Sequence, residues 1–212
     1  MNGRTRLPLF PLRTVLFPGG LLSLKVFEAR YLDLVSTCLR EGTGFGVVAL
    51  TEGTEVQHAS QGVTFEAVGC LARVLEVDAE QPGILQVRCQ GGERFRGSAV
   101  SQAGNGLWSA EAGLLPGDAA LAPPPELVDA TRSLANAIGA LARQGTRPFL
   151  EPYRFDDAGW VANRWCACGW STNTCATRGW CRPERRGAAA QPPALPSSRR
   201  SGAGRATASS AS

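Results

Sequence analysis

Four cysteines near the end of the chain come closest to the spacing of a metal site. Cys166, Cys168, Cys175 and Cys181 fall within one short stretch, and four thiolates satisfy tetrahedral zinc. Their spacing, C-x-C-x6-C-x5-C, lacks the paired CxxC units that are typical of structural zinc sites. We therefore expect no metal and no other cofactor, and zinc at this cluster stays open as the alternative.

The chain offers neither a phosphate-binding loop nor a nucleophile with a base beside it. Lys25 is the only lysine, and the residues before it lack the GxxxxGK[ST] order. Ser23 and Lys25 have the residue types of a Ser–Lys dyad, but strand alternation predicts that both point to solvent. His58, the only histidine, lies in a polar segment without a nucleophile. We predict no catalytic residues, and rank a small hydrolase last among the possible functions.

Other charged residues leave two interpretations open. Glu28, Arg30 and Tyr31 fit a helix cap with a fixed ion pair beneath the sheet, or direct contact with a ligand. Four arginines fall on predicted strands and raise the alternative of a nucleic-acid-binding module: Arg73, Arg88, Arg94 and Arg96. Residues 1–164 hold 15 Lys and Arg against 17 Asp and Glu. That balance is weak for nucleic acid, because contacts to phosphate dominate its binding.

Short apolar runs separated by turn residues predict a β-rich first half. The expected strands are 6–10, 21–26, 45–50, 65–77, 84–88, 94–100 and 108–112. Pro8 and Pro11 place the first strand at an edge or a bend, because proline cannot donate to a ladder. Gly91 and Gly92 are expected to separate two strands. Six or seven short strands with one early helix predict a closed or nearly closed barrel.

Helical periodicity replaces strand alternation in three places. The segment 28–40 is predicted to be helical, and with the preceding Phe27 its apolar face consists of Tyr31, Leu34, Val35 and Cys38. Gly42 is placed to end this helix. Pro125 begins a second helix, whose apolar stripe runs over 127–141. Asp156 is predicted to cap a third.

The remaining cysteines and the N-terminus bear on the cellular compartment. Cys38, Cys70 and Cys89 stand singly in apolar surroundings, so we expect buried free thiols rather than disulfides. Prolines and Arg13 interrupt the first apolar run, which argues against a signal peptide. No stretch approaches the ~18 apolar residues of a membrane span. We expect a cytoplasmic protein.

The composition changes abruptly at Trp165. Residues 165–212 contain one leucine, no Val, Ile, Phe or Tyr, and seven Arg against one Glu. Such a segment buries too little apolar area to offset the cost of ordering it. We predict a disordered or aberrant tail. A frame-shifted translation of a GC-rich gene and a natural disordered tail are both open, and resequencing the gene distinguishes them.

Motifs along the first 164 residues resemble the N-terminal, substrate-binding domain of the Lon proteases. The matching stretches are LPLFPL from Leu7, VLFPG from Val15, FEARY from Phe27, FGVV from Phe45, VGCLARV from Val68, GERF from Gly92, and Asp156–Asp157 with Ala162–Asn163–Arg164. The resemblance implies an α+β fold, with a PUA-like β-barrel of about six strands and a small α-helical part after it. The expected domains are a barrel over 1–115, a linker and helical extension over 116–164, and the tail over 165–212.

The resemblance also implies a function. It indicates a bacterial, standalone, non-catalytic module that holds unfolded or degron-bearing polypeptides, with a separate protease or chaperone as its partner. It supplies no catalytic residue, and the polypeptide-binding residues are unknown. We expect binding by strand addition at the proline-bearing edge, or in an apolar cleft between barrel and helices. A broken third helix would expose the stripe over 127–141, so we also expect self-association.

Overall fold

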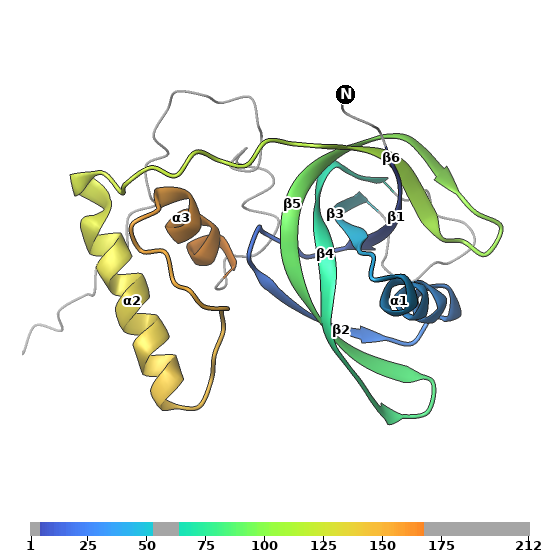
Figure 1. Cartoon of the computed structure of the whole chain (residues 1–212), viewed down its shortest axis with the longest axis horizontal. Coiled ribbons are helices and arrows are strands. Elements are labelled where there is room, and N and C mark those ends of the chain that lie inside the picture. The colour runs from blue at the N-terminus through green and yellow to red at the C-terminus, as the bar shows by residue number, and fades with distance from the viewer. Residues whose placement is uncertain (1–4, 53–63, 168–212) are drawn as a thin grey trace, which may run out of the picture. The chain divides into compact units, whose positions relative to one another are not determined.

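The computed structural model of the chain describes residues 5–52 and 64–167 (Figure 1). The elements in chain order are β1 (Thr5–Leu12), β2 (Leu21–Val26), α1 (Ala29–Glu41), β3 (Phe45–Glu52), β4 (Thr64–Gln81), β5 (Ile84–Gln102), β6 (Trp108–Leu114), a 3-10 turn (Pro125–Leu127), α2 (Val128–Arg143) and α3 (Ala158–Ala167). All of them belong to one compact unit. The predicted α+β class is confirmed.

Strand β5 closes the sheet into a barrel. The strands are ordered β2-β5-β4-β3-β1-β6, and β5 pairs with β6 as well. Residues 84–96 of β5 pair with β4, and 85–90 pair with β2 on the other side. Residues 95–102 then pair with β6. Five strands therefore form a closed ring, with β2 outside it, and Figure 1 shows β5 curving alongside β4.

The sequence predicts that Gly91 and Gly92 separate two strands. This prediction is wrong, because β5 runs through both residues. A Cβ atom at Gly91 would lie 2.1 Å from the carbonyl oxygen of Phe17. The Gly91 N–H donates to the carbonyl of Gly20 at 2.8 Å, and the Gly19 N–H donates to the carbonyl of Gly91 at 2.7 Å. Glycine is needed here because the loop after β1 lies directly on the strand.

The sequence predicts that β1 lies at an edge or near a bend, and the edge is wrong, since β1 lies between β3 and β6. Residues 5–9 pair with β6, and residues 9–12 pair with β3. Because of this stagger, Pro8 has its partner on β6 and Pro11 has its partner on β3. Each proline therefore has a paired neighbour on one side only, which suits a residue without an N–H.

Two glycines make room for the aromatic ring inside the barrel. Phe95 is fully buried on β5. A Cβ atom at Gly46 on β3, or at Gly69 on β4, would lie 2.6 Å from the tip of the Phe95 ring. Because the glycines have no side chain, three neighbouring strands can close around one large side chain. A void or a clash at this point would cost stability.

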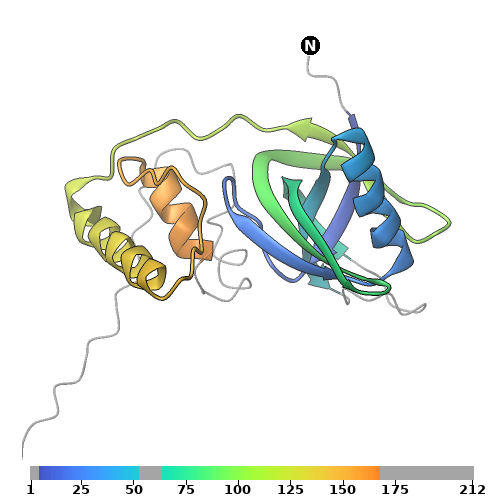
Figure 2. The ribbon, with the colours of Figure 1, turned by 60° about the horizontal axis from the view of Figure 1, so that its bottom comes forward.

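Helix α1 packs on the barrel through the face that the sequence predicts. Tyr31, Leu34, Val35 and Cys38 are buried, and the Tyr31 ring stacks on Phe10 with the ring centroids 3.9 Å apart. Gly42 ends the helix in the left-handed region, at φ 64°. Phe27 is the exception, because it precedes the helix and is 54% exposed. Figure 2 shows α1 from a second direction.

Helices α2 and α3 form a second apolar cluster. Leu134 and Ile138 at the centre of the α2 stripe are buried against Phe149, Trp160 and Val161. The centre of the stripe is therefore covered, so the expectation that a broken third helix exposes it is wrong. The reason is that α3 forms and supplies Trp160 and Val161 as packing partners. Self-association itself stays a prediction.

The ends of α3 differ from the sequence prediction. Asp157, not Asp156, caps the helix, since its carboxylate accepts from the N–H of Gly159 at 2.9 Å. The helix continues to Ala167, and the indole of Trp165 donates to the carbonyl of Ala130 at 3.2 Å. Ordered structure thus reaches three residues into the segment that we assign to the tail. Residues 168–212 lie outside the described part of the chain.

A fully buried arginine connects α3 to the loop after β1. The guanidinium of Arg164 donates to the carbonyl oxygen of Gly19 at 2.6 Å and to that of Pro18. It also lies over the rings of Phe149 and Trp160, at 5.4 and 5.6 Å from their centroids. Hydrogen bonds from a charged donor are stronger than neutral ones, so this side chain fixes the loop that also contacts Gly91.

Replacing Arg164 with methionine should lower the free energy of unfolding by about 2 to 4 kcal/mol, because two partly buried carbonyl groups lose their charged donor. Urea denaturation measures the change. The matched control is Arg132→Met, since Arg132 is exposed and paired with Asp129 at 2.9 Å, a contact of at most ~1 kcal/mol. Equal effects of the two substitutions would contradict the role given to Arg164.

Ala99 has a backbone conformation that suits glycine. It is exposed, has φ 47°, and lies at the bulge between β5 and β6. Ala99→Gly should raise the free energy of unfolding by about 1 kcal/mol, since the left-handed region is costly for a residue with a Cβ atom. In Ala79→Gly, on an exposed part of β4, the same change should destabilise. Thermal denaturation of both variants tests this, and destabilisation by Ala99→Gly would disprove it.

Candidate functional site

The cysteines give no reactive or metal-binding centre among the described residues. Cys38, Cys70 and Cys89 are buried free thiols, as predicted. Burial raises the pKa of Cys70 and of Cys89 to about 12, and it raises the pKa of Cys38 as well. These thiols therefore stay protonated at neutral pH, when a thiol is a poor nucleophile and metal ligand.

The cysteine cluster of the tail falls mainly outside the described residues. Cys166 is half-buried on α3, whereas Cys168, Cys175 and Cys181 are not described. Within residues 5–52 and 64–167, no group of three or more His, Cys, Asp or Glu side chains is placed to hold a metal ion. His58 also falls outside these ranges.

The residues Glu28 and Arg30 form the predicted ion pair at the start of α1. The Arg30 guanidinium lies 2.7 Å from the Glu28 carboxylate, lies over the Tyr31 ring, and donates to the carbonyl of Gly106 at 2.9 Å. The Glu28 side chain makes no capping hydrogen bond to the helix, so the capping part of the prediction is wrong. Arg30 connects α1 to the β5–β6 turn, which is a structural role.

The four arginines of the nucleic-acid alternative do not act as one basic surface. Arg88 pairs with Glu76, and Arg94 pairs with Asp118, each at 2.6 Å. Arg73 and Arg96 are exposed on β4 and β5. Because carboxylates neutralise two of the four, the arrangement adds no support for phosphate binding.

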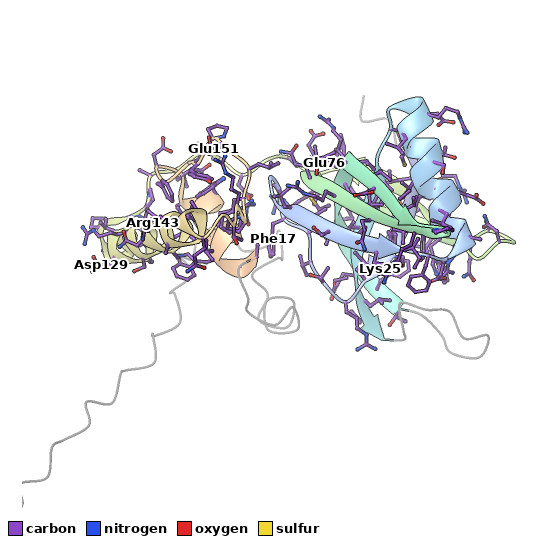
Figure 3. All side chains as sticks on the ribbon, turned by 90° about the horizontal axis from the view of Figure 1, so that it is seen from below. Phe17, Lys25, Glu76, Asp129, Arg143 and Glu151 are labelled. Atoms are coloured by element: carbon purple, nitrogen blue, oxygen red, sulfur yellow. The ribbon has the colours of Figure 1, made fainter. Side chains whose placement is uncertain are left out.

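The residues Ser23 and Lys25 lie on β2, both exposed, on the face opposite to the buried Leu24 and Val26. This is the solvated arrangement that alternation predicts. Figure 3 labels Lys25 on β2. No acid or base of a catalytic site is placed beside Ser23 by any hydrogen bond or ion pair described for residues 5–52 and 64–167.

Strand β2 is the only described strand with an edge that pairs with no other described strand along its whole length. Over its whole length it pairs with β5 alone, from Leu21 opposite Gln90 to Val26 opposite Leu85, without a register shift. Every other described strand has a second neighbour along part of its length. The unpaired N–H and C=O groups of such an edge can accept another strand. The sequence instead predicts this edge at β1, because prolines suit an edge strand.

Comparison with known proteins gives one family and two solved structures. The family model of the ATP-dependent protease La (LON) substrate-binding domain matches residues 6–169. The Lon N-terminal domain protein from Xanthomonas campestris is 31% identical, with a TM-score of 0.62, and the match covers 82% of this chain and 88% of that chain. The N-terminal domain of Mycobacterium avium complex Lon protease is 13% identical over 84% and 83%, with a TM-score of 0.43.

A search of curated proteins gives no match. None of the helices in the described part of the chain has the length and apolarity to cross a membrane. The family match spans the barrel, α2 and α3, and it includes the Arg164 contact. The chain belongs to the Lon substrate-binding domain family, as the motifs of its sequence indicate.

Proposed function

We propose that this protein captures unfolded or extended polypeptides without cleaving them, as a substrate-recognition module. The observation that carries the proposal is the family match over residues 6–169, which is to the substrate-binding domain of Lon and not to its catalytic part. The open edge of β2 supports it physically, because an extended chain binds a sheet edge through its backbone, with little dependence on sequence.

We infer that the protein acts without ATP hydrolysis and without a Ser–Lys dyad, and that it hands bound chains to a separate protease or chaperone. The domain division at residues 115 and 116, the standalone form and the cytoplasmic location are predictions from the sequence.

The direct test compares one protein in its folded and unfolded forms. A reduced, carboxymethylated protein that cannot refold should bind this chain at least ~10-fold more tightly than its native form, because only the former offers extended backbone and apolar side chains. Fluorescence anisotropy with labelled ligand gives both affinities. Equal affinity for the two forms would disprove polypeptide capture.

Salt dependence separates this function from the nucleic-acid alternative. Polypeptide binding should change little between about 50 and about 200 mM salt, whereas phosphate binding would fall steeply over that range. Tight, strongly salt-dependent binding of single-stranded RNA in the same assay would favour the alternative.

A further inference from the structure

We propose that β2 is the polypeptide-binding site, and that an extended segment of the bound chain pairs with it as an added strand. The bound segment alternates apolar and polar residues and has an acidic residue beside Lys25. This rests on the proposed function and adds the location and the chemistry of the bound segment. Three features of the described residues carry it: the edge, the alternation of side chains, and an uncompensated charge.

The edge of β2 is regular, whereas two other described stretches that have a neighbour on one side only are bulged. One is β5 after Arg96, which pairs with β6 alone and has a register shift between Ser98 and Ser101. The other is the part of β4 beyond Ala72, where β3 has ended. That part of β4 has register shifts between Val74 and Glu76 and between Asp78 and Gln81. Bulges of this kind twist an edge and hinder further pairing. β2 carries none over Leu21–Val26, so it can extend a ladder over its whole length.

The side chains of β2 define what an added strand must place beside them. Leu24 is 8% exposed and Val26 is 1% exposed, and both point into the core, whereas Ser23 and Lys25 point outward. Neighbouring strands align their side chains row by row on each face. The bound segment therefore needs apolar residues in one row and polar residues in the other.

The charge of Lys25 determines which type of residue suits the polar row of the bound segment. No ion pair involves Lys25 among the described residues, and its cross-strand neighbour on β5 is the neutral Gln86. The next cation on that face, Arg88, is already paired with Glu76 at 2.6 Å. Opposite charges on adjacent strands attract and like charges repel. An acidic residue in the bound segment would give Lys25 the partner that it lacks.

A methylation series tests strand addition directly. The probe is a peptide of about nine residues that alternates Val and Thr and has one central Glu in the polar row. Successive N–H groups of a strand point to opposite sides, so methylation of every second amide blocks one edge of the peptide only. We expect one of the two methylated peptides to bind at least ~10-fold more weakly and the other to bind within about twofold of the parent.

A charge reversal tests the role of Lys25. The Glu peptide should bind the natural chain about two- to fivefold more tightly than the same peptide with Lys, and Lys25→Glu should invert this preference. The control is Arg143→Glu on α2, which makes the same change of charge on an exposed helix residue (Figure 3). It should leave the preference unchanged.

The outcomes separate this inference from the proposed function. If the carboxymethylated protein binds but both methylated peptides bind like the parent, or Lys25→Glu has no more effect than Arg143→Glu, the β2 site is wrong and capture stands. If the unfolded protein also fails to bind, both proposals are wrong. If Lys25→Glu changes the oligomeric state in ultracentrifugation rather than peptide binding, β2 pairs with a second copy, and the peptide site is wrong.

Discussion

The closure of the barrel by β5 is the constraint on which the rest of the structure depends. Five strands use their hydrogen-bonding edges on one another, and β5 is long enough to pair with β2 as well. Closure requires Gly46 and Gly69 next to the Phe95 ring, since a side chain at either would meet it. Because the described part of the ring leaves no full-length edge of its own, the open backbone edge that we propose as the binding site is that of β2.

The loop between β1 and β2 links this edge to the helices. Its residues Gly19 and Gly20 hydrogen-bond to Gly91 in the middle of β5, and its carbonyl groups at Pro18 and Gly19 accept from Arg164. The start of β2 is thus fixed from two directions, by the barrel and by α3. A fixed edge binds an extended chain at a lower entropic cost than a mobile one, because it is ordered before binding.

Much of this architecture follows from local patterns in the sequence. The apolar face of α1, its end at Gly42 and the alternation in β2 are visible there, because helix and strand periods differ. The position of β1 and the continuity of β5 are not, since prolines and glycines have the same local preferences whether they end a strand or allow close packing. One feature of the sequence indicates the buried role of Arg164. This residue shares a helix face with Trp160 and Val161, so a charged side chain falls on an apolar face.

The candidate site shows the same division between local and non-local information. Outward-pointing Ser23 and Lys25 are predictable from alternation, but which strand lies at the edge depends on pairing between distant segments. Hydrogen–deuterium exchange with saturating alternating peptide is the most direct measurement of that point. Our account predicts slower exchange at backbone amides of residues 21–26, with little change across α2. Protection of α2 with no change at β2 would contradict it.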